Sequence, residues 1–367
     1  MPRKSENIYK RKDGRWEGRY IRGRDINQKA IYGYLYGKSY TEVKNKLKQI
    51  TMTKTVEQAE TINFAEISID WIENKKMLVK ESTLSHYKSV IDNHIIPILG
   101  EYKIASISSD IIQYHINKLL KEGLTGKTVN DILTIIKSII KYASCKGFEH
   151  NCDLSTISVK TKRNDIQTLT IFEQKILCNF LVDNLNNKNF GILLSIYTGI
   201  RIGELCAMRW SDIDLSEKIL KINKTMLRIQ DNFSEHHLNK TKVIITPPKS
   251  EDSVRVIPIP QIIFDIICKL QRNSDAYILT GKCDSFIEPR NMQYYFKSVL
   301  KKCNLRDVNF HILRHTFATR CVESGFEIKS LSEILGHSDV KITLQRYVQS
   351  SMNLKRKNMY KLNYLSA

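Results

Sequence analysis

Residues 197–205 read Tyr-Thr-Gly-Ile-Arg-Ile-Gly-Glu-Leu, and this stretch predicts a helix, a break at a glycine and the start of a second helix. Arg201 falls at the break. An arginine in a turn beside a helix N-terminus is well placed to bind an anion. The alternative is a structural arginine that pairs with Glu204, three positions further on. This stretch alone does not choose between the two interpretations.

A second group of polar motifs follows about a hundred residues later, as His-Ile-Leu-Arg-His at 311–315, Leu-Gly-His at 335–337 and Tyr347 in Gln-Arg-Tyr-Val. On a helix, His311 and Arg314 share a face. His311 and His315 have the spacing of a metal-binding pair. However, the glutamate of an HExxH motif is absent, no third ligand has suitable spacing, and the intervening arginine would repel a cation. The pattern therefore disfavours a metal site.

Between these two groups the sequence predicts three short strands, at residues 219–223, 241–246 and 253–258. Lys249 falls in the turn Pro-Pro-Lys-Ser-Glu-Asp that precedes the last strand. A lone lysine in a loop is ordinarily only a solvated charge, so Lys249 is a candidate site residue only in combination with the motifs around it.

The combined set of polar residues consists of two arginines, a lysine, two histidines and a tyrosine. Metal-dependent nucleases need carboxylates for their ions, and nucleoside triphosphatases need a GxxxxGK[ST] loop, which is absent here. Arginines can instead neutralise the non-bridging oxygens of a phosphodiester, and a tyrosine can attack phosphorus. Histidine and lysine supply hydrogen-bond donors and proton transfer.

In order and spacing this set resembles the tyrosine recombinase (phage integrase) family, through the motifs Thr-Gly-x-Arg-x-Gly-Glu, His-x-Leu-Arg-His and Leu-Gly-His followed by Tyr. The resemblance is strong over residues 165–350. The helical region 61–148 matches the core-binding domain of the family by position and helix count. The basic segment 1–54 resembles the arm-type DNA-binding domain of lambda-like and conjugative-transposon integrases.

The resemblance implies a multidomain α+β fold. A small three-stranded β-sheet with a helix is expected at residues 1–54, and a four-helix, SAM-like core-binding domain at 61–148. The third domain, at 165–367, is expected to be a mixed, mainly α catalytic domain with a small antiparallel sheet and a C-terminal tail.

The resemblance also implies the role of each motif residue. Tyr347 would attack the scissile phosphate and hold the DNA 3′ end as a phosphotyrosine, which releases a 5′ hydroxyl. Arg201 and Arg314 would clamp the phosphate, and Lys249, with Lys242 as the alternative, would protonate the leaving oxygen.

The histidines His311 and His337 would donate hydrogen bonds and assist proton transfer. Glu204 matches its motif and is interpreted as orienting the structure. The phosphotyrosine retains the energy of the broken bond, so neither a metal nor another cofactor is expected.

The charge of the chain agrees with a nucleic-acid partner. Its 367 residues carry a net charge of +20, and residues 1–54 hold 15 Lys and Arg against 5 Asp and Glu, which is half of the excess. Such basicity predicts a polyanionic partner, either nucleic acid or an anionic membrane surface. No apolar run of about 18 residues and no apolar signal segment occur. We therefore expect double-stranded DNA and no membrane.

The cysteines support an intracellular setting. The eight cysteines show neither a CxxC pair nor zinc-ligand spacing, which favours free thiols in a reducing cytoplasm. The expected location is the cytoplasm of a bacterium, in association with the nucleoid.

The basic N-terminal segment predicts a hairpin centred on Asp13-Gly14, a third strand at 30–36 and a helix at 40–49 capped by Ser39. Basic and aromatic residues alternate along these strands. An ordinary solvated basic face is the alternative to a sheet that binds DNA. The candidate DNA-binding residues are Arg15, Arg19, Arg22, Arg24, Tyr20 and Tyr34.

Two polar stretches, at residues 50–60 and 149–168, are expected to be linkers. Between them, apolar spacings of three and four predict four helices, which begin near Thr61, Ser82, Ile111 and Gly126. After the second linker, Thr170 and Glu173 predict a capping box that opens the first helix of the last domain.

The function expected from the resemblance is a site-specific DNA integrase of a mobile element, which acts as a homotetramer on attachment core and arm sites. An excisionase and a host DNA-bending protein are expected partners. Two alternatives stay open: DNA relaxation by type IB topoisomerase chemistry, and a DNA-binding regulator whose catalytic domain is inactive.

Overall fold

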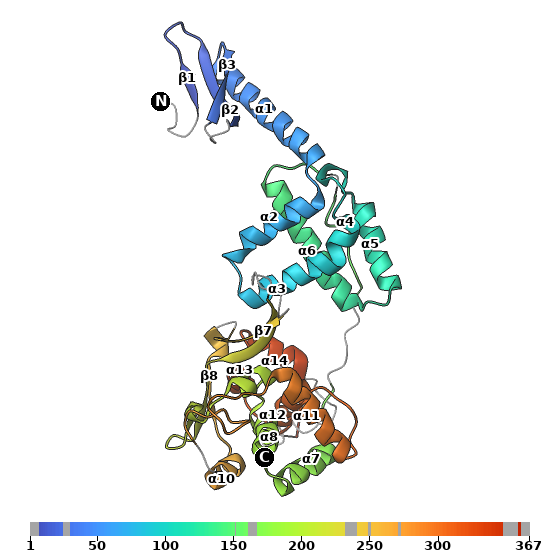
Figure 1. Ribbon diagram of the computed structural model, residues 1–367, viewed down its shortest axis with the longest axis vertical. Coiled ribbons are helices and arrows are strands. Elements are labelled where there is room, and N and C mark those ends of the chain that lie inside the picture. The colour runs from blue at the N-terminus through green and yellow to red at the C-terminus, as the bar shows by residue number, and fades with distance from the viewer. Residues whose placement is uncertain are drawn as a thin grey trace. The chain divides into compact units, whose positions relative to one another are not determined.

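The computed structural model describes residues 7–24, 30–150, 152–160, 167–231, 241–248, 251–270, 273–347 and 359–360. It divides into two compact units, residues 1–163 and 164–367, which are described separately below (Figure 1). The chain is multidomain and mostly helical, with small antiparallel sheets, as expected.

A three-stranded antiparallel sheet opens the first unit, with β1 at Ile8–Lys10, β2 at Trp16–Arg24 and β3 at Ala30–Gly37 in the order β1-β2-β3. The expected turn at Asp13-Gly14 is present in a longer form. Hydrogen bonds from Arg11 N to Arg15 O and from Gly14 N to Arg11 O close it, and only Gly14 has a positive φ, of 85°. A three-residue loop with one left-handed glycine therefore replaces the expected tight turn.

Helix α1, at Tyr40–Thr61, packs one face of this sheet. Ser39 Oγ accepts a hydrogen bond from Glu42 N at 3.1 Å, which confirms the expected cap. The close packing depends on Gly18, because a Cβ there would lie 2.5 Å from a Val43 methyl carbon. The helix continues well beyond residue 49, so the expected linker at 50–60 is helical and not irregular.

The rest of the first unit is a helical bundle around an apolar core of its own. Its elements are α2 at Phe64–Lys76, α3 at Glu81–Val90, a π-helical turn η1 at Ile91–Ile95, α4 at Ile96–Leu99, a 3-10 turn η2 at Ile104–Ser106, α5 at Ser109–Lys121 and α6 at Gly126–Cys145. Four helical segments were expected, and all are present. Asn63 caps α2 and Ser108 caps α5, because each side chain accepts a hydrogen bond from the N3 backbone N–H.

The second unit is a mainly helical domain. Its elements are α7 at Ile171–Asp183, α8 at Asn187–Thr198, α9 at Ile202–Ala207, η3 at Trp210–Asp212, β4 at Ile213–Asp214, β5 at Ile219–Ile222, β6 at Thr225–Gln230, β7 at Thr241–Thr246, η4 at Glu251–Ser253, β8 at Arg255–Pro258, α10 at Gln261–Lys269, α11 at Pro289–Lys302, α12 at His311–Glu323, α13 at Ile328–Leu335 and α14 at Val340–Tyr347. The capping box of Thr170 and Glu173 at the start of α7 is confirmed.

Small antiparallel sheets flank the helices of this unit. One has the order β4-β5-β8, and the other is the hairpin β6-β7. The three expected strands are present as β5, β7 and β8, whereas β6 was not predicted. Helices α8 and α12 lie against each other in the middle of the unit, and α7, α10 and α11 surround them (Figure 1). Arg201 follows α8, and α12 carries His311 and Arg314, so this central pair positions the first two of the motifs singled out in the sequence.

Candidate active site

The break between α8 and α9 has the form predicted from residues 197–205. Helix α8 ends at Thr198, Gly199 takes a left-handed φ of 66°, and α9 begins at Ile202. A Cβ on Gly199 would lie 2.5 Å from Phe317 Cδ1 on α12, so only glycine fits at this crossing. Arg201 stands directly before α9, and 35% of its side chain is exposed.

A buried carboxylate, Glu204, joins two arginines. It accepts bonds from Arg201 Nη1 at 2.8 Å and from Arg255 Nη1 and Nη2 at 3.0 and 2.9 Å. Only 3% of Glu204 is exposed. Burial by itself would raise the pKa of Glu204, but the hydrogen bonds and charge of Arg255 and the charge of Arg201 outweigh it and lower the pKa to about 2. The pairing of Arg201 with Glu204 is therefore real, and it leaves part of the guanidinium facing solvent.

The end of helix α13 gathers three arginines from distant parts of the chain. Three consecutive carbonyl oxygens there each accept a hydrogen bond from a different guanidinium. The pairs are Ile334 with Arg255 (2.6 Å), Leu335 with Arg314 (2.6 Å) and Gly336 with Arg201 (3.2 Å). The last carbonyls of a helix lack intrahelical partners and carry the negative end of its dipole. This helix end therefore both satisfies and orients the arginine cluster.

Gly336 allows that helix end to approach the cluster so closely. It takes a left-handed φ of 65°, and a Cβ there would lie 3.0 Å from Arg255 Cδ. The Leu-Gly-His motif therefore has a structural role in addition to supplying its histidine, because its backbone carbonyls contact the arginines on one side of the site.

His337 and Arg314 form the inner part of the site. Arg314 is 2% exposed, and its Nη2 lies 2.9 Å from His337 Nε2, while Nη1 donates to Gly199 O at 3.0 Å. Since a guanidinium only donates, Nε2 accepts, and Nδ1–H then donates to Thr343 Oγ1 at 2.8 Å. Burial and the charge of Arg314 lower the pKa of His337 to about 3, which agrees with a neutral ring.

Tyr347 ends α14 inside this cluster. It is 6% exposed, and its Oη lies 2.8 Å from His315 Nδ1 on α12. The ring of His337 is parallel to the Tyr347 ring, with centroids 6.4 Å apart. Burial raises the pKa of Tyr347, although the positive charges of Arg314 and Arg346 oppose this effect. At neutral pH the phenol is therefore protonated.

His311 occupies the outer edge of the site, at the first residue of α12. Its ring meets the His315 ring edge to face, with centroids 4.5 Å apart. Desolvation, together with His315 and the charge of Arg314, lowers the pKa of His311 to about 4. Because His311 remains exposed, it can reach a ligand that arrives from solvent.

The site carries a net positive charge. Burial and the charges of Arg201 and Arg255 lower the pKa of Arg314 to about 9. The described site places three guanidiniums around one buried carboxylate, so a bound phosphodiester would offset part of the remaining charge.

The structure brings together five of the six predicted catalytic residues: Arg201, His311, Arg314, His337 and Tyr347. Lys249 lies outside the described residues. The alternative lysine, Lys242, lies on β7 with its Nζ 3.7 Å from Asp231 Oδ1, and 39% of its side chain is exposed.

Three residues of the site were missed by the sequence reasoning, namely Arg255, His315 and Thr343. His315 was considered only as half of a metal pair, although its position directly after Arg314 could have drawn attention to it. Arg255 and Thr343 belong to none of the motifs considered. Arg255 contacts Glu204, which is distant in the sequence, and Thr343 contacts His337 across a turn.

The predicted DNA-binding residues of the N-terminal sheet do not all share a face. Arg19 pairs with Tyr34 across β2 and β3, on the face that α1 leaves open, and Tyr34 is 49% exposed. Arg15, at the end of the hairpin loop, lies 5.7 Å from the Tyr36 ring centroid. Tyr20 lies on the opposite face, over Gly33. The side chains of Arg22 and Arg24 lie outside the described residues.

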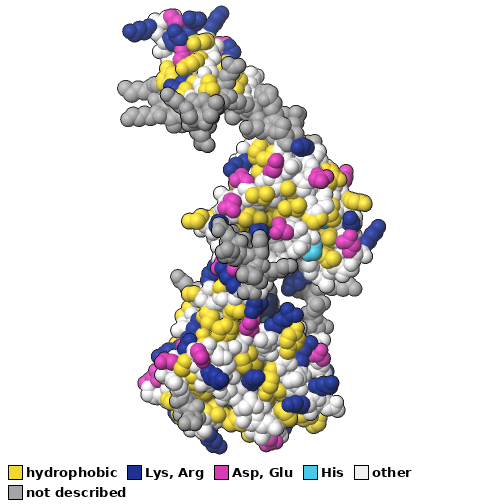
Figure 2. Space-filling model, in the orientation of Figure 1, with side chains coloured by type: hydrophobic (Ala, Val, Ile, Leu, Met, Phe, Trp, Pro, Cys, Tyr) yellow, Lys and Arg dark blue, Asp and Glu magenta, His cyan; other side chains and the backbone are white. Residues whose placement is uncertain are grey.

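Other sites of chemistry are not evident in the part of the chain that the structure describes. No group of three or more His, Cys, Asp or Glu residues there is arranged to hold a metal ion. None of the described helices combines the length and the apolar character needed to cross a membrane. On the face shown in Figure 2, Lys and Arg side chains are spread over both units.

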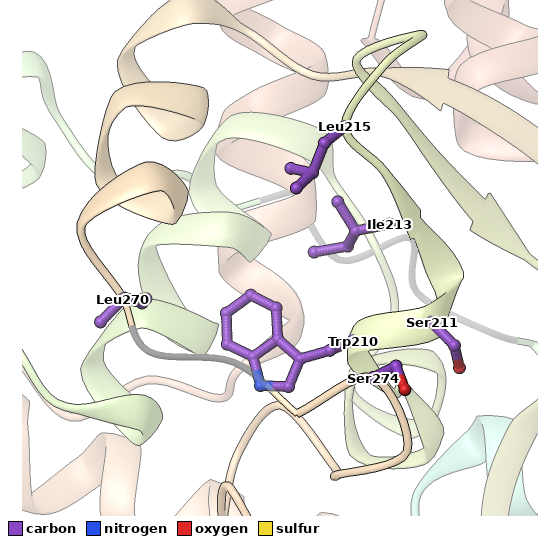
Figure 3. Close-up of a pocket in the computed structure, with 6 residues that line it drawn as sticks. All are labelled: Trp210, Ser211, Ile213, Leu215, Leu270 and Ser274. Atoms are coloured by element: carbon purple, nitrogen blue, oxygen red, sulfur yellow. The ribbon is translucent and has the colours of Figure 1, made fainter.

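A hollow of about 540 Å³, lined by four apolar residues and two serines, lies elsewhere in the second unit, beside η3 and the end of α10. Figure 3 shows Trp210, Ile213 and Leu215 along it, with Leu270 across from Trp210. Trp210 stacks on Phe190 in the core, with centroids 5.6 Å apart. None of the predicted catalytic residues lines this hollow.

The mainly helical domain places an arginine cluster beside a buried tyrosine, as the sequence motifs predicted. The model of the phage integrase family matches residues 164–353, and the model of the phage integrase N-terminal SAM-like domain matches residues 63–120. The chain belongs to the phage integrase family, the tyrosine recombinases, and its activity is site-specific DNA recombination.

Relatives of known name align over most of this chain. A "Tyrosine recombinase XerC-like" protein of Caldanaerobacter subterraneus subsp. tengcongensis is 28% identical, over 94% of this chain and 94% of its own length. The ICEBs1 integrase of Bacillus subtilis is 22% identical, over 89% and 90%.

Solved structures show a similar fold. The Tn1549 transposon integrase in complex with a circular intermediate DNA superposes with a TM-score of 0.68 at 20% identity, over 82% of this chain and 99% of that one. A lambda integrase tetramer bound to a Holliday junction gives a TM-score of 0.58 at 17% identity, over 94% and 98%.

Proposed function

We propose that this chain is the integrase of a bacterial mobile element and that Tyr347 is its nucleophile. The observation that carries the proposal is the position of Tyr347, whose Oη lies in a buried cluster with His315, Arg314 and His337. A phenol held beside guanidiniums faces the group that it would attack, because a phosphodiester binds where positive charge gathers. Integrases of phages and of conjugative elements among the relatives support the mobile-element origin.

The roles of the other residues follow from their exposure. Arg201 and His311 face solvent and are proposed to contact the non-bridging oxygens first. Arg314 is nearly inaccessible, and three of its hydrogen bonds go to Gly199, Leu335 and His337. We assign it a fixed positive charge beneath the phosphate.

Covalent trapping on DNA tests the nucleophile. The full chain is incubated with a nicked suicide duplex that carries its attachment site, and the denatured protein is analysed for bound DNA. We expect a covalent adduct with the wild-type protein and none with Tyr347→Phe, which should still bind the duplex. An adduct in Tyr347→Phe would disprove the assignment.

Covalent trapping, together with a plasmid relaxation assay, distinguishes the integrase from the two alternative functions. Relaxation of supercoiled plasmids that lack a defined site would favour type IB topoisomerase chemistry. Specific binding by the wild-type chain without any adduct would favour a DNA-binding regulator. Adduct formation only at defined sites supports the integrase. EDTA should leave it unchanged, because the phosphotyrosine retains the energy needed for rejoining without a metal or another cofactor.

The lysine that protonates the leaving oxygen is proposed to be Lys249, with Lys242 as the matched alternative. Each is replaced by alanine, and each variant is tested on DNA whose scissile 5′ oxygen is replaced by sulfur. A thiolate leaves without protonation, so the sulfur substrate should restore cleavage to the variant that lacks the acid. Restoration of Lys242→Ala rather than Lys249→Ala would reassign the role.

A division of labour among domains is also proposed. Residues 1–54 would bind arm sites through the open face of the sheet, with Arg15, Arg19 and Tyr34 among the contacts. Residues 61–148 and 165–367 would enclose the core site. We further propose a homotetramer on DNA in the bacterial cytoplasm, assisted by an excisionase and a host DNA-bending protein. DNase protection of arm sites should be lost in Arg19→Ala while core-site protection remains.

A further inference from the structure

The proposed attack by Tyr347 raises the question of where the phenolic proton goes. A neutral phenol is a weak nucleophile, so its O–H bond must break as the O–P bond forms. The acceptor must lie within hydrogen-bond distance of Oη. Three histidines surround this part of the site, at positions 311, 315 and 337.

His337 is already fully engaged. Its Nε2 accepts from Arg314, and its Nδ1–H donates to Thr343. No lone pair on this ring is left for the phenol. Its parallel position beside Tyr347 orients the nucleophile but offers it no acceptor.

His311 is displaced from the phenol. It packs edge-on against His315, and among the described residues no hydrogen bond joins it to Tyr347. Its exposed place at the N-terminus of α12 suits contact with the phosphate instead.

His315 has the required geometry. Its Nδ1 lies 2.8 Å from Tyr347 Oη, and the two ring centroids are 5.7 Å apart. Because Tyr347 is protonated, the phenol donates and Nδ1 accepts, which places the proton of the His315 ring on Nε2.

The charges around His315 keep it neutral before DNA binds. Burial, then Arg346 on α14 and Arg314 on α12, lower the pKa of His315 to about 4. His311 and Tyr347 are the other titratable groups against this ring. A phosphodiester would bring a negative charge close to these arginines and raise the proton affinity of the ring. DNA binding would thus prepare the acceptor.

We infer that His315 is the proton acceptor for Tyr347, an inference that rests on the proposed function. As Oη bonds to phosphorus, the phenolic proton moves to His315 Nδ1, and the bond from phosphorus to the 5′ oxygen breaks. That oxygen takes its proton from the separate acid proposed above. In rejoining, the 5′ hydroxyl gives its proton back to that acid as its oxygen bonds to phosphorus. The bond from phosphorus to Tyr347 Oη breaks, and His315 returns its proton to the departing oxygen.

The test compares His315→Asn with His315→Leu in the full chain. Asparagine places an acceptor oxygen near the position of Nδ1 but cannot take up a proton, whereas leucine can do neither. We expect both to lower the single-turnover rate of adduct formation by roughly 100-fold, within the range of general base catalysis. A His315→Asn rate within threefold of wild type would show that the hydrogen bond suffices and would overturn the inference.

A matched control lies on the same helix. Glu323 is 53% exposed and pairs with Arg320, so Glu323→Gln should keep the wild-type rate. Wild-type affinity for the duplex, measured for each variant, separates chemistry from binding. Should His315→Leu fail to fold, His315→Gln provides a second polar replacement for the same comparison.

Two further readouts exclude a merely structural role. Without the base, solvent must remove the proton, so the His315→Asn rate should rise about tenfold per pH unit between pH 7 and 9, more steeply than that of wild type. The sulfur-substituted substrate should not restore His315→Asn. A parallel pH profile, or restoration by sulfur, would overturn the inference. Failure of the wild-type chain to form an adduct would instead refute the proposed function.

Discussion

Replacing Glu204 by glutamine should lower the unfolding free energy of the second unit by more than the same replacement in an exposed ion pair of that unit. Glu204 is the buried carboxylate that holds Arg201 and Arg255. Glutamine keeps the shape, but it loses the charge and turns N–H donors toward guanidiniums that only donate. The arginines would then lack a buried counter-charge.

The magnitude follows from the pKa of Glu204. Its pKa falls from the ordinary 4.5 to about 2 in the folded chain, a difference that corresponds to about 3 kcal/mol. With only 3% of the residue exposed, solvent screening is slight. The folded pKa is the lower one, so this stability is complete above about pH 5 and is lost as the pH falls toward 2. Removing one partner of a buried pair costs roughly 3–5 kcal/mol, which agrees.

Hydrogen exchange measured by mass spectrometry on the full chain can follow each unit separately. At pH 7, Glu204→Gln should lower the unfolding free energy in peptides of the second unit by about 3 kcal/mol. The first unit, which keeps its own core, serves as an internal reference. The deficit relative to wild type should shrink toward pH 4 as Glu204 in the unfolded wild-type chain becomes protonated.

The control is a second glutamate that pairs with an arginine through both oxygens. Glu288 contacts Arg228 near the surface, where 42% of the arginine side chain is exposed. Glu288→Gln should cost less than about 1 kcal/mol. If Glu204→Gln costs no more than this control, the carboxylate does not hold the arginine cluster and the reasoning is refuted.

Further predictions concern the helix end, the inner histidine and the DNA. Gly336→Ala would place a Cβ only 3.0 Å from Arg255 Cδ on a residue with a left-handed φ, so it should reduce both stability and cleavage. The control is Gly325→Ala, where φ is also left-handed but the Cβ would meet no atom within 4 Å. Equal decreases in the thermal unfolding temperature of the two variants would contradict this. Thr343→Val removes the acceptor of the His337 Nδ1–H and should slow adduct formation about tenfold while DNA binding persists, since one buried bond is worth roughly 1–3 kcal/mol. DNA affinity should fall steeply with salt concentration, because bound phosphates release counterions, and a flat dependence would exclude extensive phosphate contacts.

Local patterns predicted the elements of this fold well, because their causes are local. The glycine break at Gly199 and the capping box of Thr170 with Glu173 depend on residues within one turn of each other. Strand β6 escaped prediction because its buried residues, Met226 and Ile229, are spaced by three rather than two. Its pairing with β7 supplies the stability that its own pattern does not indicate.

Faces and partners were harder to predict than elements. Tyr20 and Tyr34 both lie on strands, yet they point to opposite faces, because the register of β2 against β3 decides which residues share a side. Arg255 reaches the site through Glu204, 51 residues before it in the chain. Such a contact depends on the folded path of the chain between them, and no spacing rule encodes it.

The structure also explains how the site holds two buried arginines, Arg255 and Arg314, beside the partly exposed Arg201. Glu204 and the three terminal carbonyls of α13 compensate much of their charge, yet not all of it. Burial, together with the remaining positive field, keeps His315 and His337 neutral by lowering their pKa values to about 4 and about 3. A neutral His315 can accept a proton, and a neutral His337 can accept the Arg314 hydrogen bond. If a phosphodiester supplies the missing negative charge, proton transfer from Tyr347 becomes easier only when DNA occupies the site, so binding and cleavage are coupled by the same arginines.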